Sequence, residues 1–403
     1  MNADLHIHSK YSAATSARMD LPTLAREAAK KGIELVGTGD CLHPKWLSDI
    51  KALKLVDEGT FVANDTHFVL TCEIEDSARV HHLLIFPSIS KAEELQERLA
   101  KHSSDLASDG RPKVRLTGEQ VAQYAKDIDA LFGPCHAFTP WTAMYAYFDS
   151  INDCYGSMVS HVTFIELGLS ADSDYADRIA ELQNLTFLTN SDAHSPWPIR
   201  LAREFNRFEM DAPVFDELKQ AILRQNDRKP ILNVGLPPEE GKYNESACIR
   251  CYKHYSLKEC QARRWRCTCG GLIKKGVRDR VNELADYEEP KHPPHRPPYL
   301  RLIPLAEIIA LALGAPDPNA KPVRDVWSTL VSALGDEVTV LVDADVAQLD
   351  MVDDSVRDAI VAFREGKIIL HPGGGGQYGR VELPKGFRTS KSQRSLSDFS
   401  AID

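Results

Sequence analysis

The first part of the sequence contains histidine and acidic residues in close pairs that can bind metal ions. His6 and His8 form an H-x-H pair, and Asp192 and His194 form a D-x-H pair. Each pair lies at or just after a short apolar segment that is typical of a β-strand. Residues two apart on a strand point to the same side, so each pair can offer two ligands to one site. Imidazole and carboxylate groups are ordinary ligands of zinc and manganese.

Other candidate ligands follow other predicted strands. The neighbours His81 and His82 lie in one strand and therefore face opposite sides, so only one of them can reach the site, and we choose His82. Asp40 and His43 come just after a strand, and both are candidate ligands. The complete candidate set is His6, His8, Asp40, His43, Glu73, His82, His136, Glu166, Asp192 and His194.

This set is larger than one ion requires. A zinc or manganese ion takes about four to six ligands, so we expect two or three divalent ions (Zn, Mn or Mg), with Glu73 bridging two of them. Such a centre suits phosphoester hydrolysis, because divalent ions make hydroxide available at neutral pH and stabilise both the attacking and the leaving oxygen. Asp192, Glu73 and His194 are the predicted catalytic residues. The alternative, that every histidine is an ordinary structural residue, does not explain their common position at strand ends.

The elements that must position these residues are short strands and amphipathic helices. Apolar segments such as 33–39, 67–75 and 162–170 alternate with helical patterns over residues 1–234. One example is the helix predicted after Asp20, which can cap it, and before Gly32, which can end it. This alternation predicts an α/β unit with a mainly parallel sheet or barrel, whose strands would bring the ligands together at their carboxyl ends.

The cysteines indicate a second metal site in a separate unit, residues 242–285. The chain has nine cysteines, an odd number that argues against a disulfide framework and for a reducing cytoplasm. C-x-x-C at Cys248 and Cys251, with C-x-C at Cys267 and Cys269, predicts one structural zinc ion. Cys260 could replace one of these ligands, although its neighbours are typical of a helix.

Charge is distributed unevenly along the chain. The net charge is −10, but residues 242–301 hold 14 Lys and Arg against 7 Asp and Glu. Basic side chains neutralise phosphates and aromatic rings stack on bases, which favours nucleic acid as the partner over a simply solvated surface. The candidate DNA-binding residues here are Arg264, Trp265, Arg266, Lys274, Lys275 and Arg278.

The rest of the chain divides into three segments. Residues 286–300 are proline-rich and predict an extended linker, and residues 301–384 predict a mainly helical domain. In its glycine-rich loop, Gly374 and Gly375 either contact a DNA phosphate or form a tight turn. Residues 385–403 predict a disordered tail, in which Gln393, Leu396 and Phe399 have the spacing of a groove-binding helical turn. No apolar run is long enough to span a membrane.

Several motifs of residues 1–232 resemble the PHP (polymerase and histidinol phosphatase) superfamily. They include DLHIHSKYS, GTGDCLHP, VHHLLIFP, GPCHAFTPW and TNSDAHSPWP. The resemblance implies a distorted (β/α)7 barrel with a trinuclear metal centre. It would make ligands of His6, His8, Asp40, His43, Glu73, His82, His136, Asp192 and His194, with Glu166 as a further candidate.

The order of the units resembles the endonuclease Q family, and the tail resembles a PIP box, which binds the sliding clamp PCNA. The resemblance implies a monomeric archaeal or bacterial repair enzyme of the cytoplasm and nucleoid. Such an enzyme nicks double- or single-stranded DNA 5′ to deaminated bases (hypoxanthine, uracil, xanthine) and abasic sites. A histidinol-phosphate-type phosphatase and a non-catalytic PHP scaffold are the alternatives.

Overall fold

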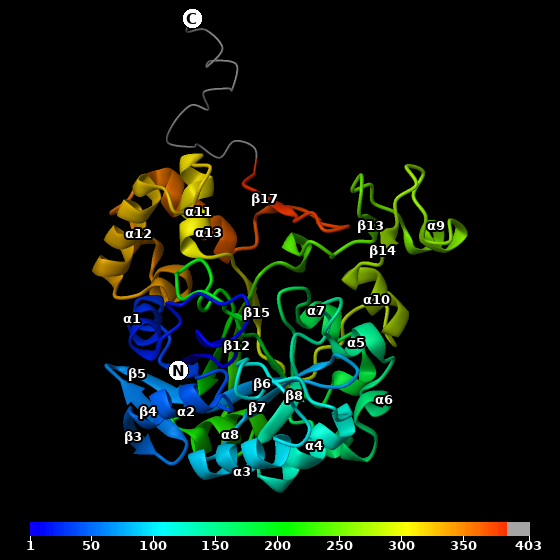
Figure 1. The fold of residues 1–403 in the computed structure, drawn as a ribbon. Coiled ribbons are helices and arrows are strands. Elements are labelled where there is room, and N and C mark those ends of the chain that lie inside the picture. Colours follow the sequence, from blue (N-terminus) through cyan, green and yellow to red (C-terminus); the bar gives the residue numbers. More distant parts are fainter. Residues whose placement is uncertain (385–403) are drawn as a thin grey trace, which may run out of the picture.

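The computed structural model describes residues 1–384. The predicted clamp-binding residues Gln393, Leu396 and Phe399 lie outside these described residues. Figure 1 shows three parts: a large unit of strands and helices, a helical part, and a small cysteine-containing part. Both smaller parts lie on the same side of the large unit (Figure 1). No helix within residues 1–384 has the length and apolar character needed to cross a membrane.

The longest sheet of the large unit has eight strands. Their order is β15 (Tyr299–Arg301), β12 (Lys229–Gly235), β11 (Phe205–Glu209), β1 (Asn2–Asp4), β2 (Leu35–Gly37), β5 (Thr66–Val69), β4 (Thr60–Ala63) and β3 (Lys54–Asp57). Strands β1, β2 and β5 are parallel, whereas β11 runs antiparallel to β1. The buried side chains of β1, β2 and β5 form the centre of the unit.

Two smaller sheets complete the unit. One has the order β6 (Thr71–Glu75), β7 (His81–Ile85) and β8 (Leu131–Pro134), and the other pairs β9 (Phe164–Glu166) with β10 (Thr186–Leu188). Strands β6, β7 and β8 are antiparallel to their neighbours. A turn as short as residues 76–80 can only connect antiparallel strands, which explains the β6–β7 pair. The α/β class is confirmed, but the expectation of a mainly parallel sheet is wrong, since the sheets are mixed.

Helices surround these strands (Figure 1). The bounds of those longer than five residues are α1 (Leu21–Lys31), α2 (Pro44–Lys51), α3 (Ile89–Leu99), α4 (Gly118–Asp127) and α8 (Phe215–Leu223). The short helices are α5 (Met144–Tyr147), α6 (Ile151–Tyr155) and α7 (Ser173–Ala176). The ends of α1 are as predicted: the Asp20 carboxylate accepts a hydrogen bond from Thr23, and Gly32 adopts φ 82°.

The proline-rich segment 286–300 packs against the large unit. The Arg296 guanidinium is buried and bonds the Asp177 carboxylate and the carbonyl oxygens of Leu182 and Leu185. The chain then enters β15, which pairs with β12. This segment is therefore part of the wall of the large unit and not a free linker.

The helical part contains α11 (Leu305–Leu313), α12 (Lys321–Leu334), a π-helical turn (Thr339–Asp343) and α13 (Asp354–Arg364). A buried ion pair joins it to α1, with Lys31 Nζ 2.6 Å from Glu337 Oε1. Glu337 also accepts hydrogen bonds from Leu305 N and Trp327 Nε1. The pair is therefore fully hydrogen-bonded at the contact between the two parts.

The cysteine unit consists of β13 (Ala247–Cys248), α9 (Leu257–Ala262), β14 (Ile273–Lys274) and α10 (Val277–Leu284). A hairpin of β16 (Ile369–His371) and β17 (Arg380–Glu382) reaches from the helical part to this unit (Figure 1). Its glycine-rich tip packs on the backbone there, and a Cβ atom at Gly375 would lie 2.4 Å from Cys248 O. The glycines thus allow two backbones to approach closely.

The Lys31–Glu337 pair leads to a stability prediction. Lys31→Met leaves the Glu337 carboxylate charged and buried, so we expect the free energy of unfolding to fall by about 3–5 kcal/mol. Lys321→Met is the control, because its partner Asp325 is exposed and such a surface pair contributes little. Thermal and urea unfolding followed by circular dichroism measures both. Equal stability of the two variants would show that the buried pair does not hold the two parts together.

Candidate metal centre

The two ligand pairs at the ends of the large unit lie side by side. Ile7 forms a parallel bridge with Ala193, and the amide of His8 donates to Ala193 O. The flanking side chains consequently meet: His8 Nε2 lies 3.1 Å from Asp192 Oδ1, and the His194 ring stacks on the His8 ring. The H-x-H and D-x-H pairs, 184 residues apart in the chain, share one pocket.

Glu73, at the middle of β6, lies between these pairs and a second group of histidines. Its Oε1 is 2.5 Å from His81 Nδ1 and 3.1 Å from His136 Nε2. Its Oε2 is 3.3 Å from His8 Nε2 and 3.2 Å from the Arg111 guanidinium. A carboxylate with histidines on both of its oxygens fits the predicted bridging position between two ions.

The choice of His82 as a ligand is wrong. His82 points away from the pocket, where Asp76 and Tyr155 bond its two ring nitrogens. The strand register explains why His81 is the one that faces Glu73. In the β6–β7 pair His81 lies opposite Glu75, which shares a face with Glu73, whereas His82 lies opposite Ile74 on the other face.

Asp40 and Glu166 bond the Nδ1 atoms of His8 and His6, respectively. Asp40 accepts hydrogen bonds from His8 Nδ1, Ser9 N and Ser12 Oγ. Both oxygens of Glu166 lie within 3.0 Å of His6 Nδ1. Carboxylates in such positions fix the tautomer and orientation of ligand histidines. These two residues thus orient ligands, although Glu166 also lies close to Cys135 in a group with His6.

His43 is outside the cluster. It precedes the first residue of α2, and its ring stacks on Tyr11 with the centroids 4.4 Å apart. Of the pair Asp40 and His43, only Asp40 therefore touches a member of the cluster. Sequence reasoning missed His81, Cys135 and Arg111. The register of β7 would have revealed the first, but no local pattern marks the other two.

Besides the His6–Cys135–Glu166 group, the residues that meet form three overlapping groups of histidines and carboxylates that could hold metal ions. The groups are His6–His8–Glu73, Glu73–His81–His136 and His8–Asp192–His194, and the ligand atoms of each lie within 4.8 Å of one another. Glu73 and His8 each belong to two groups. Within residues 1–384, His6 Nε2 is buried without a hydrogen-bond partner. An unpaired buried nitrogen is costly unless a ligand satisfies it, so the donor set fits divalent cations.

The electrostatics of the pocket agree with this fit. Burial opposes protonation of His6, but Glu166 and Glu73 raise its pKa to about 9. Burial acts against ionisation of Glu73, yet His81, His136 and His8 hold its pKa well below the usual range. Burial also opposes the charge of Asp192, whose pKa is held well below the usual range by His194 and His8. The pocket is a concentration of negative charge that requires cations or protons.

The four predicted zinc ligands also converge. The sulfur atoms of Cys248, Cys251, Cys267 and Cys269 all lie within 4.8 Å of one another. The closest pairs are 3.5 Å apart, which is too long for a disulfide bond. The Tyr255 hydroxyl donates to the Cys267 sulfur and lowers the pKa of this thiol to about 5. A stabilised thiolate in a four-sulfur group fits zinc.

Cys260 is not part of this group. It is buried in the core of the cysteine unit with Tyr255 and Ile273. Burial raises the pKa of its thiol, which disfavours the thiolate that a metal requires. The structure thus places it as a packing residue.

A cleft of about 540 Å³ opens above the candidate metal ligands. His81, His136, Glu166 and Asp192 lie at its base. Its walls carry basic and aromatic side chains from several segments, namely Arg79, Arg111, Lys113, Trp141, Lys242, Tyr243 and Tyr378. The cysteine unit and the glycine-rich hairpin thus border the same cleft as the large unit.

Solved structures match this arrangement over the whole chain. The crystal structure of PfuEndoQ, a novel lesion-specific endonuclease from Pyrococcus furiosus, is 47% identical with a TM-score of 0.93, and the match covers 100% of this chain and 99% of that one. The chain belongs to the endonuclease Q family. An endonuclease Q complex with a 27-mer duplex that has an abasic lesion at the active site is also 47% identical, with a TM-score of 0.91 and 98% and 99% coverage.

Two further relatives are proteins without an assigned activity. YqxK of Bacillus subtilis is 31% identical over 94% of this chain and 98% of its own length. MJ0043 of Methanocaldococcus jannaschii is 46% identical over 254 residues, which are 62% of this chain. This aligned region spans only 31% of the length of MJ0043. A family model of the MJ0043 C-terminal domain matches residues 304–367, which contain α11 to α13.

The predicted DNA-binding residues of this endonuclease Q chain occupy different positions. Arg264 and Arg266 are exposed on the outside of the cysteine unit, with Trp265 partly buried between them. Arg278 pairs with Glu245 and Lys275 with Glu283. Lys274 lies over the Trp141 ring. Gly374 and Gly375 are buried against residues 245–248, so the tight-turn interpretation accounts for them.

The assignment of His81, in place of His82, as a candidate metal ligand is directly testable. We expect His81→Ala to lower the metal content of the purified protein, because His81 completes one of the ligand groups. His82→Asn is the matched control and should retain the metal of the wild-type protein. Inductively coupled plasma mass spectrometry measures both. Metal loss in the His82 variant alone would contradict the assignment.

The cysteine site has its own prediction. Replacing Cys248 and Cys251 together by serine removes two thiolates, so we expect one zinc ion per chain to be lost and the thermal stability to fall. Cys260→Ser should keep the zinc, since Cys260 lies outside the sulfur group. Zinc is measured by the same elemental analysis, and unchanged zinc in the double variant would refute the site.

Proposed function

We propose that this protein is a metal-dependent DNA endonuclease that nicks the strand 5′ to deaminated bases (hypoxanthine, uracil, xanthine) and abasic sites. The observation that carries the proposal is the set of three overlapping ligand groups at the base of a cleft with cationic walls. A whole-chain relative that was solved with abasic duplex DNA supports the same substrate class. The narrower preference among deaminated bases comes from the family resemblance.

In this proposal, the large unit is a PHP-type distorted barrel that would hold two or three divalent ions. The four cysteines would hold one structural zinc ion. When bound, the divalent ions would supply an activated water and neutralise the charge that develops on the phosphate. Glu73, Asp192 and His194 would hold the ions, while Asp40 and Glu166 fix the rings of His8 and His6.

Arg111 is the residue of the chain best placed to orient the scissile phosphate. Its guanidinium bonds Glu73 and lines the cleft. Burial alone would lower the pKa of Arg111, but the nearby carboxylates of Glu73 and Asp192 raise it. A permanently charged planar group suits phosphate oxygens. Lys113, Arg79 and Lys242 would hold neighbouring phosphates along the walls.

A small-molecule phosphatase is less consistent with the walls of the cleft. Lys242, Tyr243 and Tyr378 come from outside the large unit and add cationic and aromatic side chains to the cleft, a combination that suits nucleic acid. We also propose that the tail binds a sliding clamp through Gln393, Leu396 and Phe399, on the PIP-box resemblance alone.

A nicking assay tests the proposed activity. The metal-loaded protein is incubated with end-labelled duplexes that contain one deoxyinosine, deoxyuridine or abasic site, beside an undamaged duplex. We expect a single cut 5′ to the lesion, and we expect Asp192→Asn to lower the rate by at least about 100-fold, as for loss of a metal-site residue. Asp57→Asn, in the exposed strand β3, should cut normally. Hydrolysis of histidinol phosphate without nicking would favour the phosphatase instead.

A further inference from the structure

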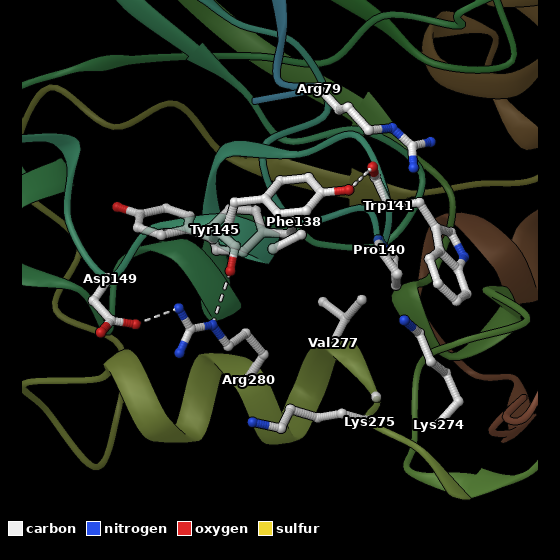
Figure 2. Close-up of a pocket in the computed structure, with 13 residues that line it drawn as sticks. Arg79, Phe138, Pro140, Trp141, Tyr145, Asp149, Lys274, Lys275, Val277 and Arg280 are labelled. Carbon is white, nitrogen blue, oxygen red and sulfur yellow. Dashed lines mark hydrogen bonds and ion pairs between the residues drawn. The ribbon is translucent and has the colours of Figure 1, made fainter. Parts of the chain in front are cut away.

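A second cavity, of about 640 Å³, adjoins the metal cleft. Figure 2 shows the residues that line this second cavity. One wall is the segment 138–149 of the large unit, and the other is formed by β14 and the start of α10. The two cavities share Arg79, Pro140 and Trp141 as lining residues. A chain molecule that lies in the metal cleft can therefore continue past Trp141 into this second cavity.

The walls of the second cavity are held in place by hydrogen bonds. The Arg280 guanidinium of α10 donates to Tyr145 O and to the Asp149 carboxylate, as Figure 2 shows. It also donates to Phe148 O. The Tyr147 hydroxyl donates to Trp141 O. These bonds join the cysteine unit to the large unit directly beneath the cavity and neutralise the carboxylate of Asp149.

Aromatic rings and cations alternate along the path between the two cavities. Lys274 Nζ lies 3.2 Å from the Trp141 ring centroid. Figure 2 shows the two side chains beside one another. Trp141 meets the edge of Tyr243, with the ring centroids 6.3 Å apart. Lys242 Nζ lies 5.6 Å from the Tyr243 ring and 5.7 Å from the Tyr378 ring. This stripe combines side chains from four segments that are distant in sequence.

The stripe is accessible and its cations are available for an anion. Trp141 is 49% exposed and Tyr378 is 69% exposed. Trp141 also adopts φ 91°, a conformation that costs a bulky residue about 1–3 kcal/mol, so the surrounding loop holds this ring in place against strain. Within residues 1–384, Lys242, Lys274 and Arg79 have no carboxylate partner in an ion pair. Burial also lowers the pKa of Lys274, as expected for a partly desolvated ammonium group.

We propose that the second cavity is a nucleotide subsite, which binds a nucleotide next to the scissile one on the same DNA strand. The base stacks on Trp141, and the phosphate lies between Lys274 and Lys242. Aromatic rings interleaved with unpaired cations are the chemistry that recognises single-stranded nucleic acid. An acidic peptide would use the cations but leave the rings without a partner. The inference rests on the proposed function in one respect, namely that a DNA strand occupies the metal cleft.

The first test measures binding without cutting. Undamaged fluorescein-labelled oligothymidylate of about eight nucleotides is titrated with the full chain, and the anisotropy gives Kd. A stacked base contributes about 1–3 kcal/mol and tenfold in Kd corresponds to about 1.4 kcal/mol, so Trp141→Ala should weaken binding about tenfold. Lys274→Gln should weaken it about threefold to fivefold, with a smaller dependence on salt.

The matched controls are Tyr252→Ala and Lys258→Gln. Tyr252 is 43% exposed and also has a positive φ, of 57°, but it does not line either cavity. Lys258 is an exposed lysine of α9. Both controls should bind within about twofold of the wild-type protein. Equal weakening in variants and controls would overturn the subsite, and so would equal displacement of the oligonucleotide by a polyglutamate peptide of the same charge.

The second test identifies the nucleotide. The base analogue 2-aminopurine is placed at one position at a time beside the lesion in a duplex, and Asp192→Asn protein is added so that the strand stays intact. We expect one neighbouring position on the lesion strand to change its fluorescence, and Trp141→Ala should abolish that change. A response from the opposite strand alone would overturn the same-strand assignment.

The two proposals fail in different ways. The Trp141→Ala and Lys274→Gln variants could bind oligothymidylate like the wild-type protein and nick lesion DNA normally. This result would overturn the subsite and leave the proposed endonuclease activity intact. Oligothymidylate binding that depends on Trp141 and Lys274, in a protein that does not nick lesion DNA, would support the subsite and remove the proposed activity.

Discussion

The constraint on which the large unit depends is the burial of the Glu73 carboxylate. This side chain is 1% exposed, and nitrogen atoms of His6, His8, His81 and His136 lie within 3.8 Å of its oxygens. A buried charge is tolerated only with partners, so segments from different sheets must meet around Glu73. The mixed, interrupted sheets and the bridge between Ile7 and Ala193 satisfy this requirement.

A second constraint joins the units into one surface. Arg280 of the cysteine unit bonds Asp149 of the large unit, and Gly375 allows the hairpin to touch the Cys248 backbone. Such contacts place side chains of the cysteine unit and hairpin beside the metal cleft. A substrate as long as a DNA strand needs this continuity, because phosphate contacts set its register relative to the reactive site.

The predictions from sequence succeeded where spacing along the chain decides the outcome. H-x-H, D-x-H and the two cysteine pairs each place ligands a fixed distance apart, and the structure brings each set together. The predictions failed where contacts with a distant segment decide how a side chain or segment is placed. His81 faces Glu73 because of the β6–β7 register, and the proline-rich segment packs because Arg296 finds the buried Asp177 carboxylate.

Residue type and local periodicity were enough to predict the α/β class, the candidate ligand types and the two clusters. The pairing of distant segments was needed to show which histidine faces the centre, that Asp40 and Glu166 bond the outer nitrogens of His8 and His6, and that Gly374 and Gly375 are buried. It also decided that Trp141 and Lys274, 133 positions apart, touch one another. These outcomes depend on pairing register and on contacts between distant segments, which have no local signature in the chain.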